Sequence, residues 1–371
     1  MRDETWMSKA IELAERGGRN VSPNPRVGAV IVENGTVIGE GYHARYGGPH
    51  AERAAIDDAR KRTGRHTFPQ ATMYCTLEPC CHSGRGKHQP PCTGAILEAE
   101  IARVVIGHRD PNPKVNGRGV SVLESAGCRV DQNVMKPRAA ALNPGFIRRM
   151  KTGRPHVTVK IAQSLDGRIA AASGDSKWIT GSQARAEVHR MRADHDAILV
   201  GSGTVLQDNP RLTVRHSSGP DPLRIVLDGR LRTPADYRVA GAGTVFFCGI
   251  HADPSRIREM EAAGAQVRIH SVHDRYPLEE VLDELGSMGI NSLLVEGGSG
   301  IFTDFLRYGL YQRLEVFTAP VILGSGVNAL NDLGQATMAD ARHFVHASWQ
   351  DAGDGNIRLT AYPEEEACLP D

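Results

Sequence analysis

A histidine, a glutamate and two cysteines are spaced as a catalytic metal site requires. His50 and Glu52 form the segment His-Ala-Glu, and Cys80 and Cys92 follow across a loop rich in Gly, His and basic residues. One imidazole and two thiolates suit zinc, and three protein ligands leave a fourth position for water. Zinc lowers the pKa of such a water to about 7. Glu52 is too close to His50 to join the same coordination sphere easily, but it can carry protons between water and substrate.

The order H-x-E followed by P-C-x-x-C is typical of zinc deaminases. Here eleven residues separate Cys80 from Cys92, so the match to this pattern is partial. Cys81 is too close to Cys80 for both to bind one ion, and Cys75 lies in a predicted strand, where we expect it to be packed. We therefore predict His50, Cys80 and Cys92 as the ligands of Zn2+ and Glu52 as the catalytic proton carrier.

Two other interpretations of this cluster stay open. His-Ala-Glu alone is more often a surface helix turn, and Pro-Cys alone is more often core packing. A structural zinc with four protein ligands would use His82 or His88 as the fourth ligand.

The composition excludes several protein classes. The chain has 371 residues and a formal net charge of +1, so it has room for two domains and no bulk basic excess for nucleic acid. No apolar run approaches the roughly 20 residues that span a bilayer, and the N-terminus lacks a signal peptide's apolar core. We expect a cytoplasmic protein, in which the seven cysteines do not form a disulfide framework.

The predicted elements around the cysteine loop alternate between strand and helix. Apolar runs at 27–32 and 36–42, joined by the Asn34-Gly35 turn, predict a hairpin. A helix from about His50 to Arg62, strands at 71–77, 102–108 and 128–134, and helices at 93–100 and 117–127 follow. We therefore predict an α/β layered domain.

The second half starts a new series of strands. Residues 135–155 are predicted to be helical, to end at Gly153 and Pro155, and to bridge two domains. Strands are predicted at 156–167, 197–202, 223–229, 244–249, 266–271 and 292–298, with helices at 182–195 and 276–289 and a closing antiparallel pair at 343–350 and 356–363. The predicted domains are 1–148 and 149–371.

Two glycine-rich turns in this second domain suggest a dinucleotide site. Gly297, Gly298 and Gly300 lie between a predicted strand and helix, where backbone N–H groups favour phosphate. The spacing is not G-x-G-x-x-G, so a plain tight turn is an equally simple interpretation. A second strand, turn and helix, "VGSGTVLQDNP", strengthens the case for a dinucleotide.

These segments together resemble a known family. "VSPNPRVGAVIV", "GYHARYGGPHAE", "TLEPCCHSGR", "DPNPKVNGRG", "KIAQSLDGRIA", "SKWITG", "VGSGTVLQDNPRLTVR" and "LLVEGG" occur in order along nearly the whole chain. They resemble the bifunctional riboflavin-biosynthesis deaminase/reductases. The resemblance implies a cytidine-deaminase-like three-layer domain followed by a dihydrofolate-reductase-like α/β domain. It also implies a phosphorylated pyrimidine substrate, Zn2+ and NADPH as cofactors, and a homo-oligomer, either dimer or tetramer, with no nucleic-acid or membrane partner.

The resemblance also implies site residues, although the loop between Cys80 and Cys92 is longer here than is usual in the family. The deaminase substrate pocket would be lined by Asn24, His43, His82 and Arg85. NADPH would contact Ala162, Trp178, Thr204, Asp208, Gly298, Ser299, Gly300, Ile301, Phe302, Thr303 and Asp304. The reductase substrate would contact Ser176, Arg192, Leu212, Arg215 and Glu296, and Lys160 is our candidate for assisting proton transfer as the sugar opens. Simpler roles exist for several of these: a turn residue for Asn24, a strand-end histidine for His43, a core side chain for Trp178 and a solvated helix face for Arg192.

Two other functions remain to be distinguished. One is a nucleobase or tRNA deaminase with a noncatalytic C-terminal domain; near-neutral charge and the second-half motifs count against it. The other is a non-enzymatic zinc-organised binding protein; the open coordination position and the nearby Glu52 count against that.

Overall fold

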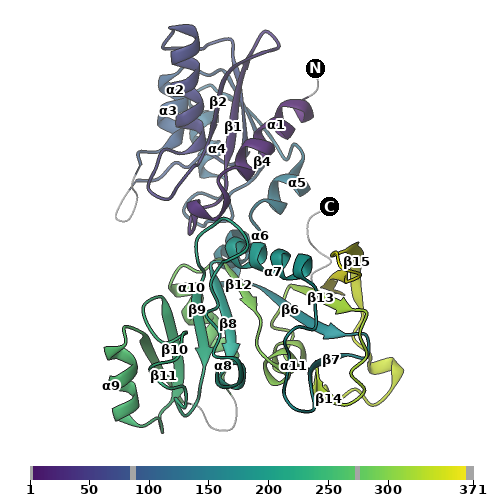
Figure 1. Ribbon diagram of the computed structural model, residues 1–371. Helices are drawn as coiled ribbons and strands as arrows, with labels where there is room; N and C mark the ends of the chain where they lie inside the picture. The colour runs from purple at the N-terminus through teal and green to yellow at the C-terminus, as the bar shows by residue number, and fades with distance from the viewer. Residues whose placement is uncertain (1–2, 84–88, 272–275, 365–371) are drawn as a thin grey trace. The chain divides into compact units, whose positions relative to one another are not determined.

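The structure is a computed structural model that describes residues 3–83, 89–271 and 276–364 (Figure 1). The chain divides into two units, one ending at Gly153 and the other beginning at Arg154. The division keeps the helix α6 (Pro144–Thr152) whole, and Gly153 ends that helix in the left-handed conformation with φ 78°. Among the helices in the described part of the chain, none is long and apolar enough to cross a lipid bilayer.

The first unit is built on a five-stranded sheet with the order β2-β1-β3-β4-β5. The strands are β1 (Gly28–Glu33), β2 (Thr36–Tyr42), β3 (Thr72–Leu77), β4 (Arg103–His108) and β5 (Arg129–Gln132). The predicted turn is confirmed: Asn34 and Gly35, both with positive φ, join β1 and β2 into an antiparallel hairpin. β3, β4 and β5 are parallel, so the loops that follow β3 and β4 leave the sheet at one edge.

Helices cover both faces of this sheet and make three layers. The helices are α1 (Asp3–Glu15), α2 (Ala51–Thr63), α3 (Cys92–Glu98), α4 (Arg118–Ser125) and α5 (Lys136–Ala141). Apolar residues of α2, α3 and α4 pack in one core with Ile31, Met73 and Ile106, and those of α1 pack in another with Val30 and Val105.

Two glycines of β2 set how closely α2 approaches the sheet. A Cβ atom at Gly39 would lie 2.3 Å from the carbonyl oxygen of Ala55, and one at Gly41 would lie 2.3 Å from the Ala55 nitrogen and 2.4 Å from the Ala51 carbonyl oxygen. These separations are too short for any side chain, so only glycine permits this contact. The close approach fixes the first turn of α2.

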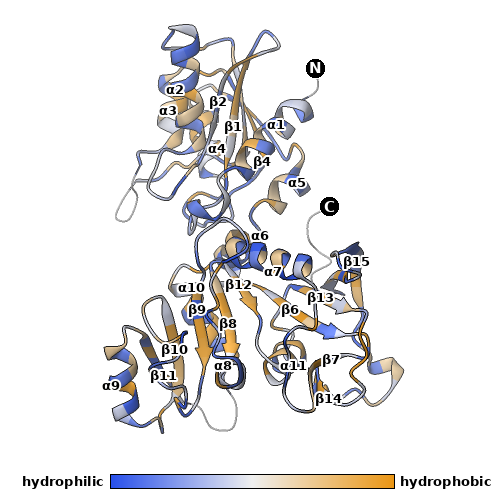
Figure 2. Ribbon diagram, in the orientation of Figure 1, coloured by the Kyte–Doolittle hydropathy of each residue, from blue (hydrophilic) through white to orange (hydrophobic). Residues whose placement is uncertain are grey.

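The second unit is built on a nine-stranded sheet with the order β11-β10-β9-β8-β12-β6-β13-β16-β15. The strands are β6 (His156–Ser164), β8 (Ala197–Gly201), β9 (Leu223–Leu227), β10 (Thr244–Gly249), β11 (Gln266–His270), β12 (Ser292–Val295), β13 (Arg313–Ala319), β15 (Phe344–Asp351) and β16 (Ile357–Pro363). All pairs from β11 to β13 are parallel, and the predicted antiparallel pair at the C-terminal end is confirmed. Figure 2 shows the apolar character of β8 and β9, as expected for strands that are covered on both faces.

Five helices flank this sheet. They are α7 (Ser182–Asp194), α8 (Ser202–Asp208), α9 (Pro254–Ala262), α10 (Leu278–Ser287) and α11 (Ser299–Arg307). Side chains of α10 and α11 pack on one face of the sheet, and those of α8 and α9 pack on the other. A separate two-stranded sheet joins β7 (Arg168–Ala171) to β14 (Gly326–Asn328). The sequence patterns did not predict β13, α9 or this small sheet.

Candidate active sites

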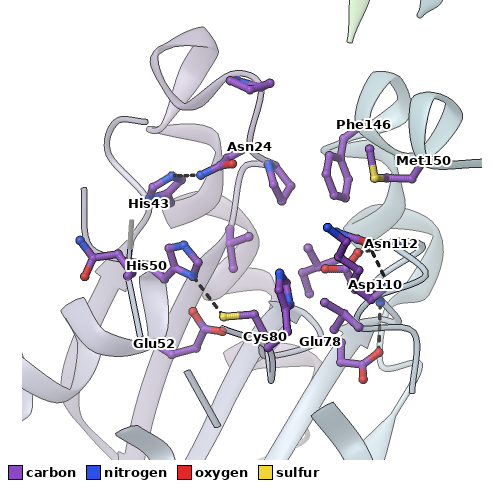
Figure 3. A pocket seen from close by; sticks show the side chains of 18 of the residues that line it. Asn24, His43, His50, Glu52, Glu78, Cys80, Asp110, Asn112, Phe146 and Met150 are labelled. Atoms are coloured by element: carbon purple, nitrogen blue, oxygen red, sulfur yellow. Dashed lines mark hydrogen bonds between the residues drawn. The ribbon is translucent and has the colours of Figure 1, made fainter. Parts of the chain in front are cut away.

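The three predicted metal ligands meet at the ends of three elements. His50 is the residue before α2, Cys80 follows β3, and Cys92 begins α3. His50 Nδ1 lies 3.5 Å from Cys80 Sγ (Figure 3), and it lies 3.3 Å from Cys92 Sγ. Within the described residues, these three form the only group of His, Cys, Asp or Glu side chains whose ligand atoms all lie within 4.8 Å of one another. His82 is not part of this group, and His88 lies outside the described residues.

The chemistry of this group fits zinc. The neighbouring Cys80 side chain and burial raise the pKa of the Cys92 thiol well above its usual range. This shift disfavours a bare thiolate, whereas a bound cation would favour it, and one imidazole with two thiolates is a zinc donor set. Cys75 is fully buried within β3, which confirms that it is a core residue.

Glu52 lies in the first turn of α2, where the close contact with β2 holds it. Its side chain is only 3 % exposed, and Figure 3 shows its carboxyl group beside Cys80. Burial raises the pKa of Glu52. A raised pKa makes the carboxyl group easier to protonate, which suits a group that takes up and gives back a proton in general acid–base chemistry.

His50, Glu52 and Cys80 line a cavity of about 850 Å³. On one wall, the Asn24 amide nitrogen lies 3.2 Å from His43 Nε2, and His43 Nδ1 lies 2.9 Å from the Pro49 carbonyl oxygen. Burial lowers the pKa of His43 and favours the neutral ring, in which Nδ1 donates to the Pro49 carbonyl and Nε2 accepts from Asn24. His82 also lines the cavity, whereas Arg85 lies outside the described residues.

The opposite wall contains residues that the analysis of the sequence did not assign. Asp110 and Asn112 belong to the quoted segment "DPNPKVNGRG", and Phe146 and Met150 come from α6 (Figure 3). Burial raises the pKa of Asp110 to about 7. The spacing of Asp110 and Asn112 just after a strand was a usable signal, whereas nothing in the local sequence marks Phe146 as a cavity residue.

Glu78 positions this wall. Its carboxylate accepts hydrogen bonds from the backbone nitrogens of Gly117 at 2.9 Å, Val120 at 3.2 Å and Asp110 at 3.3 Å. The side chain is 3 % exposed. A buried carboxylate with three N–H donors fixes the loop between β4 and α4, which carries Asp110 and Asn112.

The second unit contains a cavity of about 590 Å³ at the carboxyl ends of its parallel strands. It brings together most of the residues expected there: Lys160, Ala162, Ser176, Trp178, Arg192, Thr204, Asp208, Leu212, Arg215, Glu296, Gly298 and Phe302. The other expected NADPH residues, Ser299, Gly300, Ile301, Thr303 and Asp304, lie on α11 but do not line this cavity.

Arg192 and Glu296 form an ion pair inside the cavity. Arg192 Nε and Nη2 donate to the two Glu296 oxygens at 2.8 and 2.7 Å, and Nη1 donates to the Thr213 carbonyl oxygen at 3.3 Å. Burial opposes ionisation of Glu296, but Arg192 outweighs it and lowers the pKa of Glu296 to about 2. Burial also lowers the pKa of Lys160, which brings that amine closer to proton transfer at neutral pH.

Several lining residues of this cavity were not predicted. His189 Nδ1 accepts a hydrogen bond from the Arg215 backbone nitrogen at 3.2 Å, and its ring meets the edge of His216 with 4.7 Å between centroids. Burial, Arg192 and Arg215 lower the pKa of His189 to about 4, so it is neutral at pH 7. Trp178 is 67 % exposed and carries the Arg185 guanidinium 4.5 Å from its ring centroid, so it is not a core residue.

Comparisons with known proteins agree with both sites. Residues 1–108 match the family model "Cytidine and deoxycytidylate deaminase zinc-binding region", and residues 155–357 match "RibD C-terminal domain". The riboflavin biosynthesis protein RibD of Escherichia coli is 42% identical over 359 residues, covering 93% of this chain and 95% of that protein. The chain belongs to the RibD family.

Solved structures of RibD proteins extend the match to the whole fold. Acinetobacter baumannii RibD superposes with a TM-score of 0.87 at 37% identity, covering 97% of this chain and 98% of that one. A Thermotoga maritima diaminohydroxyphosphoribosylaminopyrimidine deaminase/5-amino-6-(5-phosphoribosylamino)uracil reductase superposes with a TM-score of 0.81, at 37% identity and the same coverage. The expected pair of domains, deaminase-like and reductase-like, is confirmed, and the protein is a bifunctional deaminase and reductase of riboflavin biosynthesis. Because the similarity spans both halves, a RibD protein is favoured over a deaminase with a noncatalytic second domain.

Proposed function

We propose that the two units catalyse successive reactions. The first hydrolyses an amino group from 2,5-diamino-6-(5-phosphoribosylamino)pyrimidin-4(3H)-one and releases ammonia. The second uses NADPH to reduce the ribosyl group of that product, which gives 5-amino-6-(5-phosphoribitylamino)uracil. The observation that carries the proposal is the meeting of His50, Cys80 and Cys92 beside a buried Glu52 in a cavity.

In the deaminase, His50, Cys80 and Cys92 would hold the zinc ion. Zinc bound by three protein ligands supplies a water whose pKa is lowered to near neutrality. Glu52 takes up a proton at its carboxyl group and delivers it to the departing amino nitrogen. Asn24, held by His43, would offer its remaining amide hydrogen-bonding groups to the substrate, and His43, His82 and Arg85 are assigned to the same pocket.

In the reductase, NADPH supplies a hydride to the sugar carbon. Lys160, with its lowered pKa, would give a proton to the ring oxygen as the sugar opens. Arg215, Ser176 and Leu212 would hold the substrate. Arg192 would act by fixing Glu296 and the Thr213 backbone. The coenzyme would lie against Ala162, Trp178, Thr204, Asp208 and the segment from Gly298 to Asp304.

One assay tests both halves. The protein is incubated with the diaminopyrimidinone phosphate, and ammonia release and NADPH absorbance are followed together. We expect ammonia first and NADPH loss after it. Ammonia without any NADPH loss would point to the deaminase-only alternative, and loss of neither would overturn the proposal.

We also propose that the protein is a homo-oligomer, a dimer or tetramer, in the cytoplasm, where reducing conditions keep Cys80 and Cys92 as thiols. β15 is the last strand of its sheet, pairs with β16 on one side, and carries Trp349 66 % exposed. An exposed edge strand is a template for pairing with another chain. Light scattering that gave a mass of 40.2 kDa, that of one chain, would contradict the oligomer.

A further inference from the structure

The carboxyl ends of three neighbouring strands form one continuous edge in the second unit. β12 pairs with β8, and β8 pairs with β9, all in parallel (Figure 1). Glu296 follows β12, Ser202 follows β8 and Asp228 follows β9. In open parallel sheets, nucleotides bind in the crevice outside these strand ends.

The position of the nicotinamide, the reacting half of the coenzyme, can be inferred along this edge of the sheet. Lys160 and Glu296 lie on β6 and just after β12, so the nicotinamide belongs there. Gly297 and Gly201 sit so close that a Cβ at Gly297 would lie 2.9 Å from the Gly201 nitrogen. A Cβ at Gly297 would also lie 3.3 Å from Ile301 Cβ, and one at Gly201 would lie 3.0 Å from Ile301 Cγ1, so neither glycine position has room for a side chain of its own. With the nicotinamide there, the adenosine half would extend toward the ends of β8 and β9.

Arg232 lies at the ends of β8 and β9, where polar contacts hold its side chain in place. Arg232 Nη2 donates to Ser202 Oγ at 2.7 Å, and Arg232 Nε lies 3.6 Å from Asp228 Oδ1. Asp228 is fully buried, whereas the Arg232 side chain is 55 % exposed. Asp228 Oδ2 already accepts from the Thr233 nitrogen and hydroxyl, both at 2.8 Å. Asp228 Oδ1 has no hydrogen-bond partner among the described residues, but the side chain is fully buried beside the arginine, so it is not exposed to a ribose hydroxyl.

The backbone is built to place this arginine. Leu231 is buried and has φ 49°, in the left-handed region that a branched side chain seldom adopts. Its nitrogen donates to the Asp228 carbonyl oxygen at 2.8 Å. Arg256 donates to the carbonyl oxygens of Leu231 at 2.8 Å and Arg232 at 3.0 Å. A strained turn held from several sides is typical of a ligand clamp.

We propose that Arg232 and Ser202 bind the 2′-phosphate of the adenosine ribose of NADPH, and that they make the reductase select NADPH over NADH. This inference rests on the proposed use of NADPH. The two coenzymes differ only in that phosphate. A guanidinium binds a phosphate with paired, charge-assisted hydrogen bonds, and an arginine at this place in a nucleotide-binding sheet is the usual partner of a 2′-phosphate.

The test measures binding, independently of turnover. Dissociation constants of NADPH, NADH, 2′,5′-ADP and 5′-AMP are determined by calorimetry or fluorescence for the wild type and for R232A, R232K and S202A. We expect R232A to weaken NADPH and 2′,5′-ADP by about tenfold or more, with NADH and 5′-AMP changed less than about twofold. R232K should lose less than R232A. R258A removes another exposed arginine, on α9, and should change nothing.

Ammonia release by the first unit and the thermal midpoint of each variant report on folding. If R232A does not fold, the NADPH and NADH affinities of R232K and S202A are compared with those of the wild type in the same way, with smaller expected losses of NADPH affinity. Equal losses for NADPH and NADH, or no loss for 2′,5′-ADP, would overturn the assignment of Arg232 while leaving the reductase intact. A wild type that bound neither coenzyme would overturn the proposed reductase together with this inference.

Discussion

Arg192 and Glu296 hold each other by two parallel hydrogen bonds of 2.8 and 2.7 Å, with side chains only 12 % and 8 % exposed. Each was expected to touch substrate, yet each satisfies most of the other's polar atoms. Removing one partner of a buried pair leaves an uncompensated charge, which costs about 3–5 kcal/mol.

We therefore expect R192M to lower the free energy of unfolding of the second unit by about 3 kcal/mol. The double variant R192M/E296L should recover part of that loss, because it removes both charges. Denaturant titration measures both. A single variant as stable as the wild type would contradict a buried, paired arginine.

Glu52 offers the sharpest test of the deaminase. E52Q keeps the size of the side chain but cannot carry a proton, so ammonia release should fall by at least about 10²-fold. Zinc content, measured by elemental analysis, should stay at the wild-type value. E124Q, on the exposed surface of α4, is the control. A rate for E52Q near that of the wild type would refute the assigned role.

The ligand set predicts a contrast between adjacent cysteines. C92S should lose zinc and ammonia release together, because a serine hydroxyl is a poor zinc ligand. C81S changes the residue next to a ligand and should keep both. Chelation of the wild type should reproduce C92S. Full zinc occupancy in C92S, or its loss in C81S, would exclude Cys80 and Cys92 as the pair of thiolate ligands.

Glu78 should matter for the substrate pocket although it touches no reacting atom. E78A leaves two buried N–H groups and one part-buried N–H group without their acceptor, which we expect to cost about 3 kcal/mol in unfolding free energy. The loop carrying Asp110 would loosen, so KM should rise more than kcat falls. E78Q keeps one acceptor and should lie between. Unchanged KM in E78A would show that the loop does not depend on this carboxylate.

Acid should destabilise the second unit through His189. Its pKa is about 4 when folded and 6.5 when unfolded, so between these values only the unfolded chain takes up the proton. Stability is therefore full above pH 6.5 and falls as pH drops to 4, by at most about 1.4 kcal/mol per pH unit. Glu296, with a folded pKa of about 2, adds a further loss below its ordinary 4.5.

The variant H189N keeps an acceptor for the Arg215 nitrogen but does not titrate in this range. Its unfolding free energy should depend less steeply on pH between 6.5 and 4 than that of the wild type. H251N, at an exposed histidine after β10, should keep the wild-type slope. Equal slopes in H189N and the wild type would exclude His189 as the source.

The metal centre was largely predictable because its signal is local. His50 and Glu52 share one helix turn, and Cys80 and Cys92 flank one loop, so spacing alone restricted the choice. The alternation of apolar runs likewise predicted most strands of both sheets. β13 was missed although it lies between β6 and β16, and α9 was missed because its residues are mostly polar.

The cavity walls were harder to predict because distant segments build them. Phe146 and Met150 reach the deaminase cavity from α6, more than fifty residues beyond Cys92. Ser299 and Thr303 stay predicted coenzyme contacts; Thr303 donates to the Ser299 carbonyl oxygen at 2.6 Å, and Ser299 Oγ lies 3.3 Å from Asn331 Oδ1. Which of several adjacent residues faces a cavity depends on side-chain packing, and the spacing of residues in the sequence does not reveal it.

At Gly39 and Gly41 the strand β2 and the helix α2 are in direct backbone contact, and this contact restricts which substitutions the enzyme can accept as it evolves. Glu52 lies in the first turn of α2 and His50 comes just before it. That helix packs so closely on Gly39 and Gly41 that not even one methyl group fits between helix and strand. A mutation to alanine on β2, in residues that never meet the substrate, would tilt the proton carrier and the imidazole together. Tolerance to change at those two strand positions should therefore be as low as at the cysteines, and the architecture, rather than the chemistry, is what restricts it.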